Sequence, residues 1–314
     1  MLDVKRLRVL REVSLQGSFS GAAEALSYTQ SAVSQQIAAL EREAGTLLVE
    51  RGARGVRLTE AGRALVVHTD AILARLQAAE AELEAIAGLR GGSLRVVTFA
   101  SAGASLLPLA VTRFRDAHPA VELTLNPAEP DDGIAALKSG ESDVTVTVEA
   151  DFRPIADESL DLVHVLDDPM FVALPRGHEL ANRMRVRLAD LAGEQWIQGT
   201  SSASCPDTAI FLRTAAEAGF EPRIAFESDD YGAIQGFIAA GVGVALIPDL
   251  ALVSAREDIV IRELDGASPH RRIMAATLAG CNRGPAARAM ISILRQVGQE
   301  WETRRRGLAI AAVA

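Results

Sequence analysis

The stretch that most constrains this chain is residues 18–44, which read as two short helices separated by a tight turn. Ser20 can cap the first helix, whose small side chains let another helix approach closely, and residues 27–29 interrupt it. Thr29 is a candidate N-cap for the second helix. Four apolar residues of that second helix recur at helical spacing and form one narrow stripe: Val33, Ile37, Leu40 and Ala44.

The opposite face of the second helix is short, polar and flat, whereas a solvated helix normally alternates charges there. It carries Ser31, Gln35, Ala38 and Arg42, with Ser34 beside them. A Gln side chain can form two hydrogen bonds with an adenine edge, and a Ser hydroxyl can bond to a base or a phosphate. The face is suited to a DNA major groove, and a polar surface helix of any helical domain is the alternative.

A basic turn follows this helix and favours the DNA interpretation. After Gly45, a natural helix stop, the glycine-punctuated segment 52–59 reads as a small β-wing. Arg54 lies at its centre, between Arg51 and Arg57, so the wing presents three guanidinium groups to a phosphate backbone. Thr59 then caps a long helix. The sequence therefore predicts a winged helix-turn-helix that continues into a long helix.

This combination resembles the N-terminal domain of LysR-type transcriptional regulators, over the segment GSFSGAAEALSYTQSAVSQQIAALEREAGTLLVERGARGVRLTEAGRAL. The resemblance is close over residues 3–88 and looser over nearly all of the remaining chain. It implies a sequence-specific regulator that binds double-stranded DNA at a dyad-symmetric operator. Together with the residue chemistry, it assigns the DNA contacts to Ser20, Thr29, Gln30, Ser31, Ser34, Gln35, Gln36, Arg51, Arg54 and Arg57.

The chain departs from many family members in and just after the second helix. Ser31 replaces a common Pro, Gln35 replaces an Arg, and residues 48–49 are Leu-Val where many members carry Phe. The change at residues 48–49 should only repack a small core. Gln35 in place of Arg should alter the base preference and weaken the attraction to phosphates, so the operator sequence does not follow from the resemblance.

The net charge of −9 argues at first against a nucleic-acid partner, but its distribution matters more. Residues 1–63 hold nine Lys and Arg against seven Asp and Glu, and the rest of the chain carries −11. The acidic part should stay away from DNA while the clustered arginines approach it. Because a domain of +2 binds DNA weakly, tight binding requires more than one copy.

The long helix that begins at Glu60 carries an apolar repeat that predicts how copies pair. Charges cover its other faces, so the stripe is suited to a second helix, with packing on the protein's own body as the alternative. The resemblance points to the same pairing, and it implies a homodimer or homotetramer. The repeat consists of Leu65, Ile72, Ala79 and Ile86 at spacings of seven, with Leu76 and Leu83 between them.

From Leu94 onward the pattern changes to alternating strands and helices, and the apolar strands near residues 94–99, 121–125 and 142–148 predict a parallel sheet covered on both faces. The whole of this part resembles the bilobed, periplasmic-binding-protein-like α/β effector domain of LysR regulators, in which crossing strands join two lobes with a cleft between them. The expected organisation is a winged helix-turn-helix, a linker helix, an effector-binding domain of two lobes and a tail. These parts cover residues 1–59, residues 60–89, residues 90–306 (lobe 1 about 93–167 and 270–306, lobe 2 about 168–269) and residues 307–314.

A small-molecule effector is expected between the two lobes, where strands end and helices begin. Helix N-termini favour anions, so an anionic effector is among the expectations. Taken one at a time, the Ser and Thr residues of these loops could equally be helix caps. The resemblance, which places the effector at these loops, assigns the site to Ser101, Ala102, Thr147, Thr200, Ser201, Ser202 and Phe226.

Several other functions find little support in the sequence. The N-terminus lacks a signal-peptide pattern and no apolar run reaches a membrane span, so a cytoplasmic protein that does not contact membranes is expected. This weakens the alternative of a solute-binding protein whose α/β part does the work. Cys205 and Cys281 lie far apart, which disfavours a peroxide sensor, a disulfide or a metal site. No nucleotide, hydrolase or metal motif points to an enzyme or a cofactor.

Overall fold

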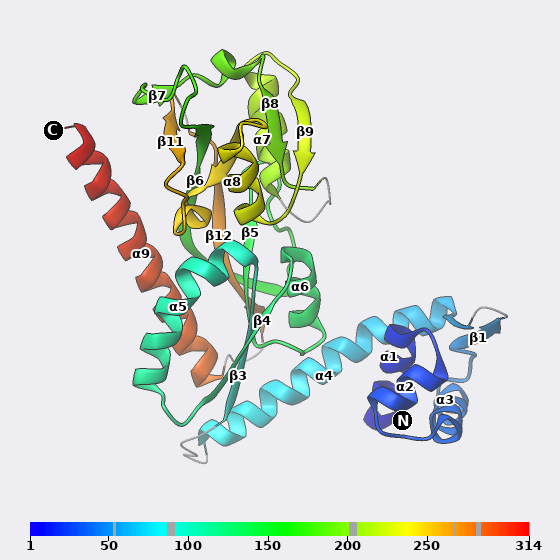
Figure 1. The fold of residues 1–314 in the computed structure, drawn as a ribbon. Helices are drawn as coiled ribbons and strands as arrows, with labels where there is room; N and C mark the ends of the chain where they lie inside the picture. The colour runs from blue at the N-terminus through cyan, green and yellow to red at the C-terminus, as the bar shows by residue number, and fades with distance from the viewer. Residues whose placement is uncertain (53–54, 87–91, 201–205, 267, 281–283, 314) are drawn as a thin grey trace. The chain divides into compact units, whose positions relative to one another are not determined.

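The structure is a computed structural model of the whole chain, shown in Figure 1. It describes all residues except 53–54, 87–91, 201–205, 267, 281–283 and 314, and it describes no side chains for residues 51–52, 55, 77–78, 81–82, 84–86 and 306–313. The chain forms two compact units, the first over Met1–Ile86 and the second over most of the remaining chain. Each unit is described below by itself.

The first unit begins with the helices α1 (Val4–Gln16), α2 (Phe19–Ala25) and α3 (Gln30–Ala44). The cap of α2 differs from the prediction. Ser18, in extended backbone, accepts a hydrogen bond from the Gly21 amide, whereas Ser20 is already inside the first turn and exposed. Only a residue in non-helical backbone just before the helix can reach the free amides, so the predicted cap at Ser20 was wrong by two residues.

The start of α3 agrees with the prediction, because the Thr29 hydroxyl accepts a hydrogen bond from the Ala32 amide. Before it, Ser27 has a φ of 55°, in the left-handed region, which makes the turn between α2 and α3 tight. At the other end Gly45 adopts a φ of 70° and stops the helix. The predicted inner stripe is buried at Val33, Ile37 and Leu40, and only half-buried at Ala44.

The predicted wing is present as the antiparallel strands β1 (Val49–Gly52) and β2 (Gly55–Leu58). The Glu41 carboxylate on α3 accepts hydrogen bonds from the amides of Leu48 and Val49, at 2.9 and 3.2 Å. The Val56 amide donates to the carbonyl of Gly17, at 3.0 Å. The wing is therefore fixed to both α1 and α3, in one core with the helix-turn-helix.

Helix α4 (Glu60–Ile86) starts, as predicted, at Thr59, whose hydroxyl accepts from the Gly62 amide. Gly62 allows the residue before the wing, Leu48, to lie close to α4, because a Cβ at Gly62 would lie 2.1 Å from the Leu48 carbonyl oxygen. The first turns of α4 pack on the helix-turn-helix core, and Asp70 accepts from Arg11 at 2.8 Å. Further along, three large apolar side chains are exposed: Ile72, Leu76 and Leu83.

The second unit contains a mixed sheet in the order β4-β3-β5-β12-β6-β11-β7 (Figure 1). The strands β4, β3 and β5 are parallel to one another, as the sequence predicts, and α5 and α9 cover the core beneath them. This first lobe consists of β3 (Ser93–Thr98), α5 (Ala100–Ala117), β4 (Glu122–Pro127), α6 (Pro130–Lys138), β5 (Val144–Glu149) and α9 (Pro285–Val313).

The strands that cross between the lobes are antiparallel to their neighbours in the sheet. Strand β12 (His270–Leu278) lies between β5 and β6 (Leu160–Pro175) and is antiparallel to both. Strand β6 continues past β12 and pairs antiparallel with β10 and β11 of the second lobe. The chain passes to the second lobe on β6 and returns on β12, and two strands that travel in opposite directions through one sheet must be antiparallel.

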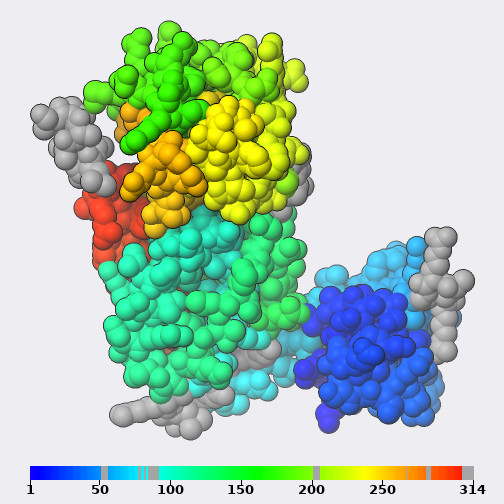
Figure 2. Space-filling model, viewed as in Figure 1, coloured from blue at the N-terminus to red at the C-terminus, as the bar shows by residue number. Residues whose placement is uncertain are grey.

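The second lobe surrounds the distal half of β6 and has two cores of its own, one of them around Trp196. In Figure 2 its atoms, green to yellow, lie above the teal and green atoms of the first lobe. The lobe comprises β7 (Arg185–Val186), η1 (Leu188–Leu191), β8 (Gln195–Gln198), α7 (Pro206–Glu217), β9 (Arg223–Glu227), α8 (Tyr231–Ala239), β10 (Ala245–Pro248), η2 (Asp249–Leu252) and β11 (Ile259–Leu264).

The ends of the chain complete the description. Helix α9 extends to Val313, through most of the segment 307–314 that was expected to be a separate tail. No helix in the described part of the chain is both long and apolar enough to cross a lipid bilayer.

Candidate functional site

The outer face of α3 is the first candidate site. Gln30, Ser31 and Gln35 are exposed on it, and Ser34 is half-buried at its side. Among the described residues the Gln35 side chain has no hydrogen-bond partner, so its amide is available to another molecule. The same helix buries Val33 and Ile37 in the core, so the rigid unit fixes the direction in which Gln35 points.

Two other predicted DNA contacts of this region make hydrogen bonds inside the unit. The Thr29 hydroxyl caps α3 and lies 3.0 Å from the Ser31 hydroxyl. The Gln36 side chain is half-buried, and its carbonyl oxygen accepts a hydrogen bond from Arg6 at 3.3 Å. Gln36 therefore fastens α3 to α1 and is less available than Gln35.

The remaining predicted DNA contacts lie on α2 and the wing. Ser20 is exposed in the first turn of α2, and Arg57 is exposed on β2. Arg54 and the side chain of Arg51 lie outside the described residues. The exposed polar face of α3 and the Arg57 guanidinium give the first unit the groups needed for base edges and phosphates.

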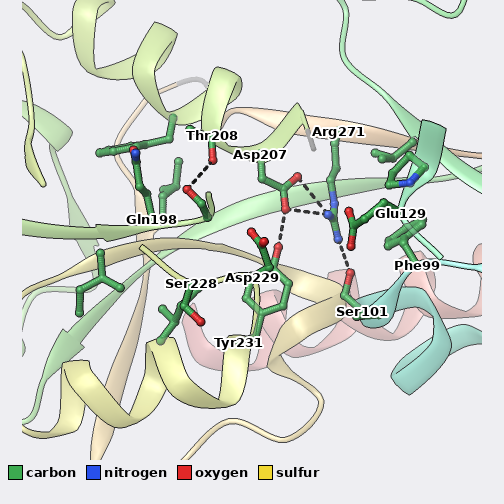
Figure 3. Close-up of a pocket in the computed structure, with 18 residues that line it drawn as sticks. Phe99, Ser101, Glu129, Gln198, Asp207, Thr208, Ser228, Asp229, Tyr231 and Arg271 are labelled. Atoms are coloured by element: carbon green, nitrogen blue, oxygen red, sulfur yellow. Dashed lines mark hydrogen bonds and ion pairs between the residues drawn. The ribbon is translucent and has the colours of Figure 1, made fainter. Parts of the chain in front are cut away.

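The second candidate site is a cavity of about 50 Å³ between the two lobes of the second unit. Figure 3 shows that its lining carries many polar groups. The first lobe contributes Ser101 at the start of α5 and Glu129 just before α6. The second lobe and the crossing strand β12 contribute Gln198, Asp207, Thr208, Ser228, Asp229, Tyr231 and Arg271.

Arg271 is the centre of a buried network that connects both lobes (Figure 3). Its guanidinium donates to Asp168 at 2.9 Å, to both oxygens of Asp207 at 2.8 and 3.0 Å, and to the Ser101 hydroxyl at 2.7 Å. Arg271 and Asp168 are almost fully buried. Burial raises the pKa of Asp168 to about 6, against the opposing effect of the Arg271 charge.

The acidic groups of the lining influence one another across the cavity. Burial raises the pKa of Glu129, and the carboxylates of Asp229, Asp207 and Asp132 raise it further. Asp207 also accepts a hydrogen bond from the Tyr231 hydroxyl. Asp229 accepts from the amide and hydroxyl of Thr200, at 2.8 and 2.9 Å. The cavity therefore carries more negative than positive charge.

The structure places the predicted effector residues unevenly. Ser101 lines the cavity, although its hydroxyl already accepts from Arg271. Ala102 and Thr147 are buried beside the cavity residues Ser101 and Val148 and do not line it themselves. Thr200 does not line it either, because its side chain holds Asp229.

Two further predictions concern the second lobe. Phe226 lies on the exposed strand β9, packs on Phe237 and is not among the residues that line the cavity. Its strand pairs with β8 in a two-stranded ladder. Ser201 and Ser202 lie outside the described residues.

Sequence reasoning missed the charged residues of the cavity. Arg271 lies with Arg272 at the start of an otherwise apolar strand, and Asp207 follows the Pro that begins α7. An arginine buried among apolar residues signals an acidic partner, but the partners lie 64 and 103 residues away. No local sequence pattern marks Glu129 or Asp229 as a residue of the cavity.

Comparisons with known proteins agree with this architecture. The model of the bacterial regulatory helix-turn-helix protein, lysR family, matches residues 4–63, and the LysR substrate binding domain matches residues 87–299. The probable HTH-type transcriptional regulator LrrA of Synechococcus elongatus is 30% identical, over 95% of this chain and 98% of the relative. The dual regulator OxyR of Escherichia coli is 28% identical, over 82% of each chain.

Solved structures show the same fold. A full-length OxyR from Pseudomonas aeruginosa superposes with a TM-score of 0.74 at 21% identity, over 94% of this chain and 95% of that one. Full-length CbnR in complex with its target DNA superposes with a TM-score of 0.63 at 22% identity, over 94% of this chain and 100% of that one.

The fold and the two sites define a DNA-binding regulator with a ligand-binding domain attached. The chain belongs to the LysR family of bacterial transcriptional regulators. It is a DNA-binding protein with an effector-binding domain, and regulators of this family form oligomers. Because the family models cover both halves, the alternative of a solute-binding protein, in which residues 1–88 have no role, is not supported.

Proposed function

We propose that this protein is an oligomeric regulator that places two copies of α3 in neighbouring major grooves of a dyad-symmetric operator. The observation that carries the proposal is the exposed polar face of α3, with Gln35 free opposite the buried Val33 and Ile37. In this arrangement Gln30, Ser31 and Gln35 contact base edges. Phosphates are contacted by Ser20, Thr29, Ser34 and the wing residues Arg51, Arg54 and Arg57, while Gln36 holds α3 in place.

Pairing of the α4 helices would deliver the two copies of α3. Ile72, Leu76 and Leu83 are exposed along α4 and follow the seven-residue repeat. Exposed apolar side chains in such a repeat are stable when they face the same stripe on a second helix. Because two copies related by a dyad read two half-sites, the affinity for the operator exceeds that of one copy.

The cavity of the second unit would hold the effector. A ligand that contacts Ser101 or Glu129 on one lobe and Asp229 on the other binds most tightly to one relative position of the lobes. It therefore shifts the population of effector-domain conformations, and with it the placement of the DNA-binding units in the oligomer. In this function the protein acts in the cytoplasm, on DNA, and has no catalytic activity of its own.

Substitutions of Gln35 and Arg57 test the assignment of α3. The Gln35→Ala protein should select a different base at one position of each half-site, because a base contact carries sequence information. The Arg57→Ala protein should bind all sequences more weakly, with a shallower salt dependence and an unchanged preference. Selection from a random DNA library, followed by titration at several salt concentrations, measures both. If the two variants lose affinity in parallel with the same preferred sequence, Gln35 does not read a base.

A further inference from the structure

The charge of the cavity between the lobes indicates what kind of effector it takes. Three acidic side chains of its lining are Glu129 from the first lobe and Asp207 and Asp229 from the second. Among the described lining residues Arg271 is the only one with a positive charge. Asp168, which accepts a hydrogen bond from Arg271 and is not itself part of the lining, adds a further carboxylate. An anion entering this space would meet an excess of like charge at short range and low dielectric.

Arg271 cannot offset this excess for an incoming anion, because its guanidinium is already committed. Its nitrogens donate to two buried carboxylates, Asp168 and Asp207, and to the Ser101 hydroxyl. One positive charge therefore faces two negative charges before any ligand enters. To bind a carboxylate ligand, Arg271 would have to release Asp207 or Asp168 and leave that buried acid unpaired, which is costly.

A second, independent feature of the lining is a buried hydrogen-bond acceptor without a donor. Gln198 is only 9% exposed, and within the described chain its side-chain carbonyl oxygen has no hydrogen-bond partner. Its NH₂ group donates to the carboxylate of Glu227 at 2.8 Å, and a carboxylate can only accept, so the amide cannot rotate to exchange its two ends. The free group of Gln198 therefore accepts, and it requires a donor from outside the described network.

We propose that the effector of this protein is a small organic cation that carries a primary ammonium or a guanidinium group. This inference rests on the proposed function, since it takes the cavity as the effector site. The positive group would lie between Glu129 and Asp229, and a further N–H of the same ligand would donate to the Gln198 carbonyl oxygen, which belongs to the same lining. The cavity volume of about 50 Å³ limits the part of the ligand that is enclosed to a few heavy atoms.

A bare metal ion does not fit the same observations. In the described part of the chain no three His, Cys, Asp or Glu side chains converge closely enough to hold one. Glu129 and Asp229 belong to different lobes, so a ligand that contacts both has to extend between them. An organic cation with several N–H donors meets this requirement, because each donor can face a different acceptor.

The same arrangement explains how such a ligand would act on the domain. Without the ligand, Glu129 on the first lobe faces Asp207 and Asp229 on the second. These like charges across the cavity oppose the approach of the lobes. A cation between them replaces repulsion by attraction. Its affinity is therefore higher for the closed arrangement of the lobes, which is the differential binding that a population shift requires.

The test uses the full-length protein and four-carbon compounds that differ mainly in charge. Putrescine is the dication, succinate the dianion and 1,4-butanediol the neutral compound, and agmatine supplies a guanidinium group. The midpoint of thermal unfolding is measured at constant ionic strength with each compound. We expect putrescine or agmatine to raise the midpoint in a saturable manner, while succinate and butanediol leave it unchanged. Stabilisation by succinate, or none by either cation, would overturn the proposal.

Two variants locate the effect. Their unfolding midpoints without ligand do not depend on which cation is chosen. Glu129→Gln removes a carboxylate of the lining, and Asp132→Asn removes an exposed one from the first turn of the adjacent helix, outside the lining. Without ligand, Glu129→Gln should raise the unfolding midpoint by relieving repulsion, and it should weaken cation binding at least tenfold. Asp132→Asn should change both much less. Equal effects of the two variants, or a lower midpoint for Glu129→Gln, would contradict the proposal.

Operator binding separates the failure of this inference from the failure of the proposed function. If the protein binds an operator and succinate stabilises it while the cations do not, the proposed function stands and the charge assignment is wrong. If no specific DNA binding is found in a library selection, the regulator itself is in doubt, whatever the cavity binds.

Discussion

The outer face of α3 and the cavity between the lobes differ in how their polar groups are used. On α3 the polar groups are exposed, and Gln35 has no hydrogen-bond partner within the described chain. In the cavity, Arg271, Asp168 and Asp207 are buried and bonded to one another. On a surface that binds a rigid partner such as DNA, the polar groups can remain hydrated in the free protein. A closed cavity must satisfy its charges internally, because burial of an unpaired charge is costly.

This difference predicts opposite responses to substitution. Changes on the face of α3 should alter DNA binding with little effect on folding, since the lost groups are solvated in the free protein. Changes in the cavity should alter stability and ligand response together, because the same side chains hold the lobes and line the site. The following three experiments test this contrast, beginning with the largest expected effect.

Replacement of Arg271 should give the largest loss of stability. In Arg271→Met the carboxylates of Asp168 and Asp207 lose their shared partner inside the protein. Removing one member of a buried ion pair typically costs about 3–5 kcal/mol. Chemical denaturation, followed by the fluorescence of the two tryptophans, Trp196 and Trp301, should show the transition at much lower denaturant concentration. Gln35→Ala should not shift it. A cost below about 1 kcal/mol would mean that the network is less important than its burial indicates.

Disruption of the exposed stripe of α4 should have the next largest effect, on DNA binding. Leu76→Glu places a charge in the proposed helix pair, so the protein should become monomeric and its operator affinity should fall by roughly 100-fold or more. Val67→Glu is the matched control, because Val67 is 69% exposed and lies on the opposite side of α4. Analytical ultracentrifugation and DNA titration measure both properties. A Leu76→Glu protein that remains oligomeric would place the pairing surface elsewhere.

The smallest effect is expected at the helix caps of the first unit, where two hydroxyls of similar exposure can be compared. Thr29→Ala removes the cap of α3 and should destabilise the first unit by about 1 kcal/mol. Ser20→Ala should change its stability by less than about 0.5 kcal/mol, because Ser18 holds the cap of α2. Hydrogen exchange of the backbone amides of residues 1–86 in the full-length protein provides the measurement, because it reports on this unit separately. Equal losses would show that Ser20 has a structural role absent from this structure.

The sequence by itself predicts most of the first unit, and the reason is the short range of its signals. The stripe of Val33, Ile37 and Leu40, the cap at Thr29 and the stop at Gly45 each depend on residues within about four positions. The error at Ser20 shows the limit of this reasoning, because Ser18 and Ser20 both satisfy the local pattern. The family resemblance then adds what such a unit does, which the pattern alone leaves open.

Only the tertiary structure decided the direction of the crossing strands and the character of the cavity. The predicted parallel pairing is confirmed for β3, β4 and β5, whereas the antiparallel pairing of β12 with β5 and β6 is set by the path of the chain between the lobes. Arg271 meets Ser101 across 170 residues and Asp168 across 103. The loops and helix ends of the sequence favour an anion, whereas the charges that the fold brings together in the cavity carry the proposal of a cationic effector. Electrostatic interactions act between neighbours in space, and a low dielectric makes them strong, so the folded chain determines which ligand charge the cavity favours.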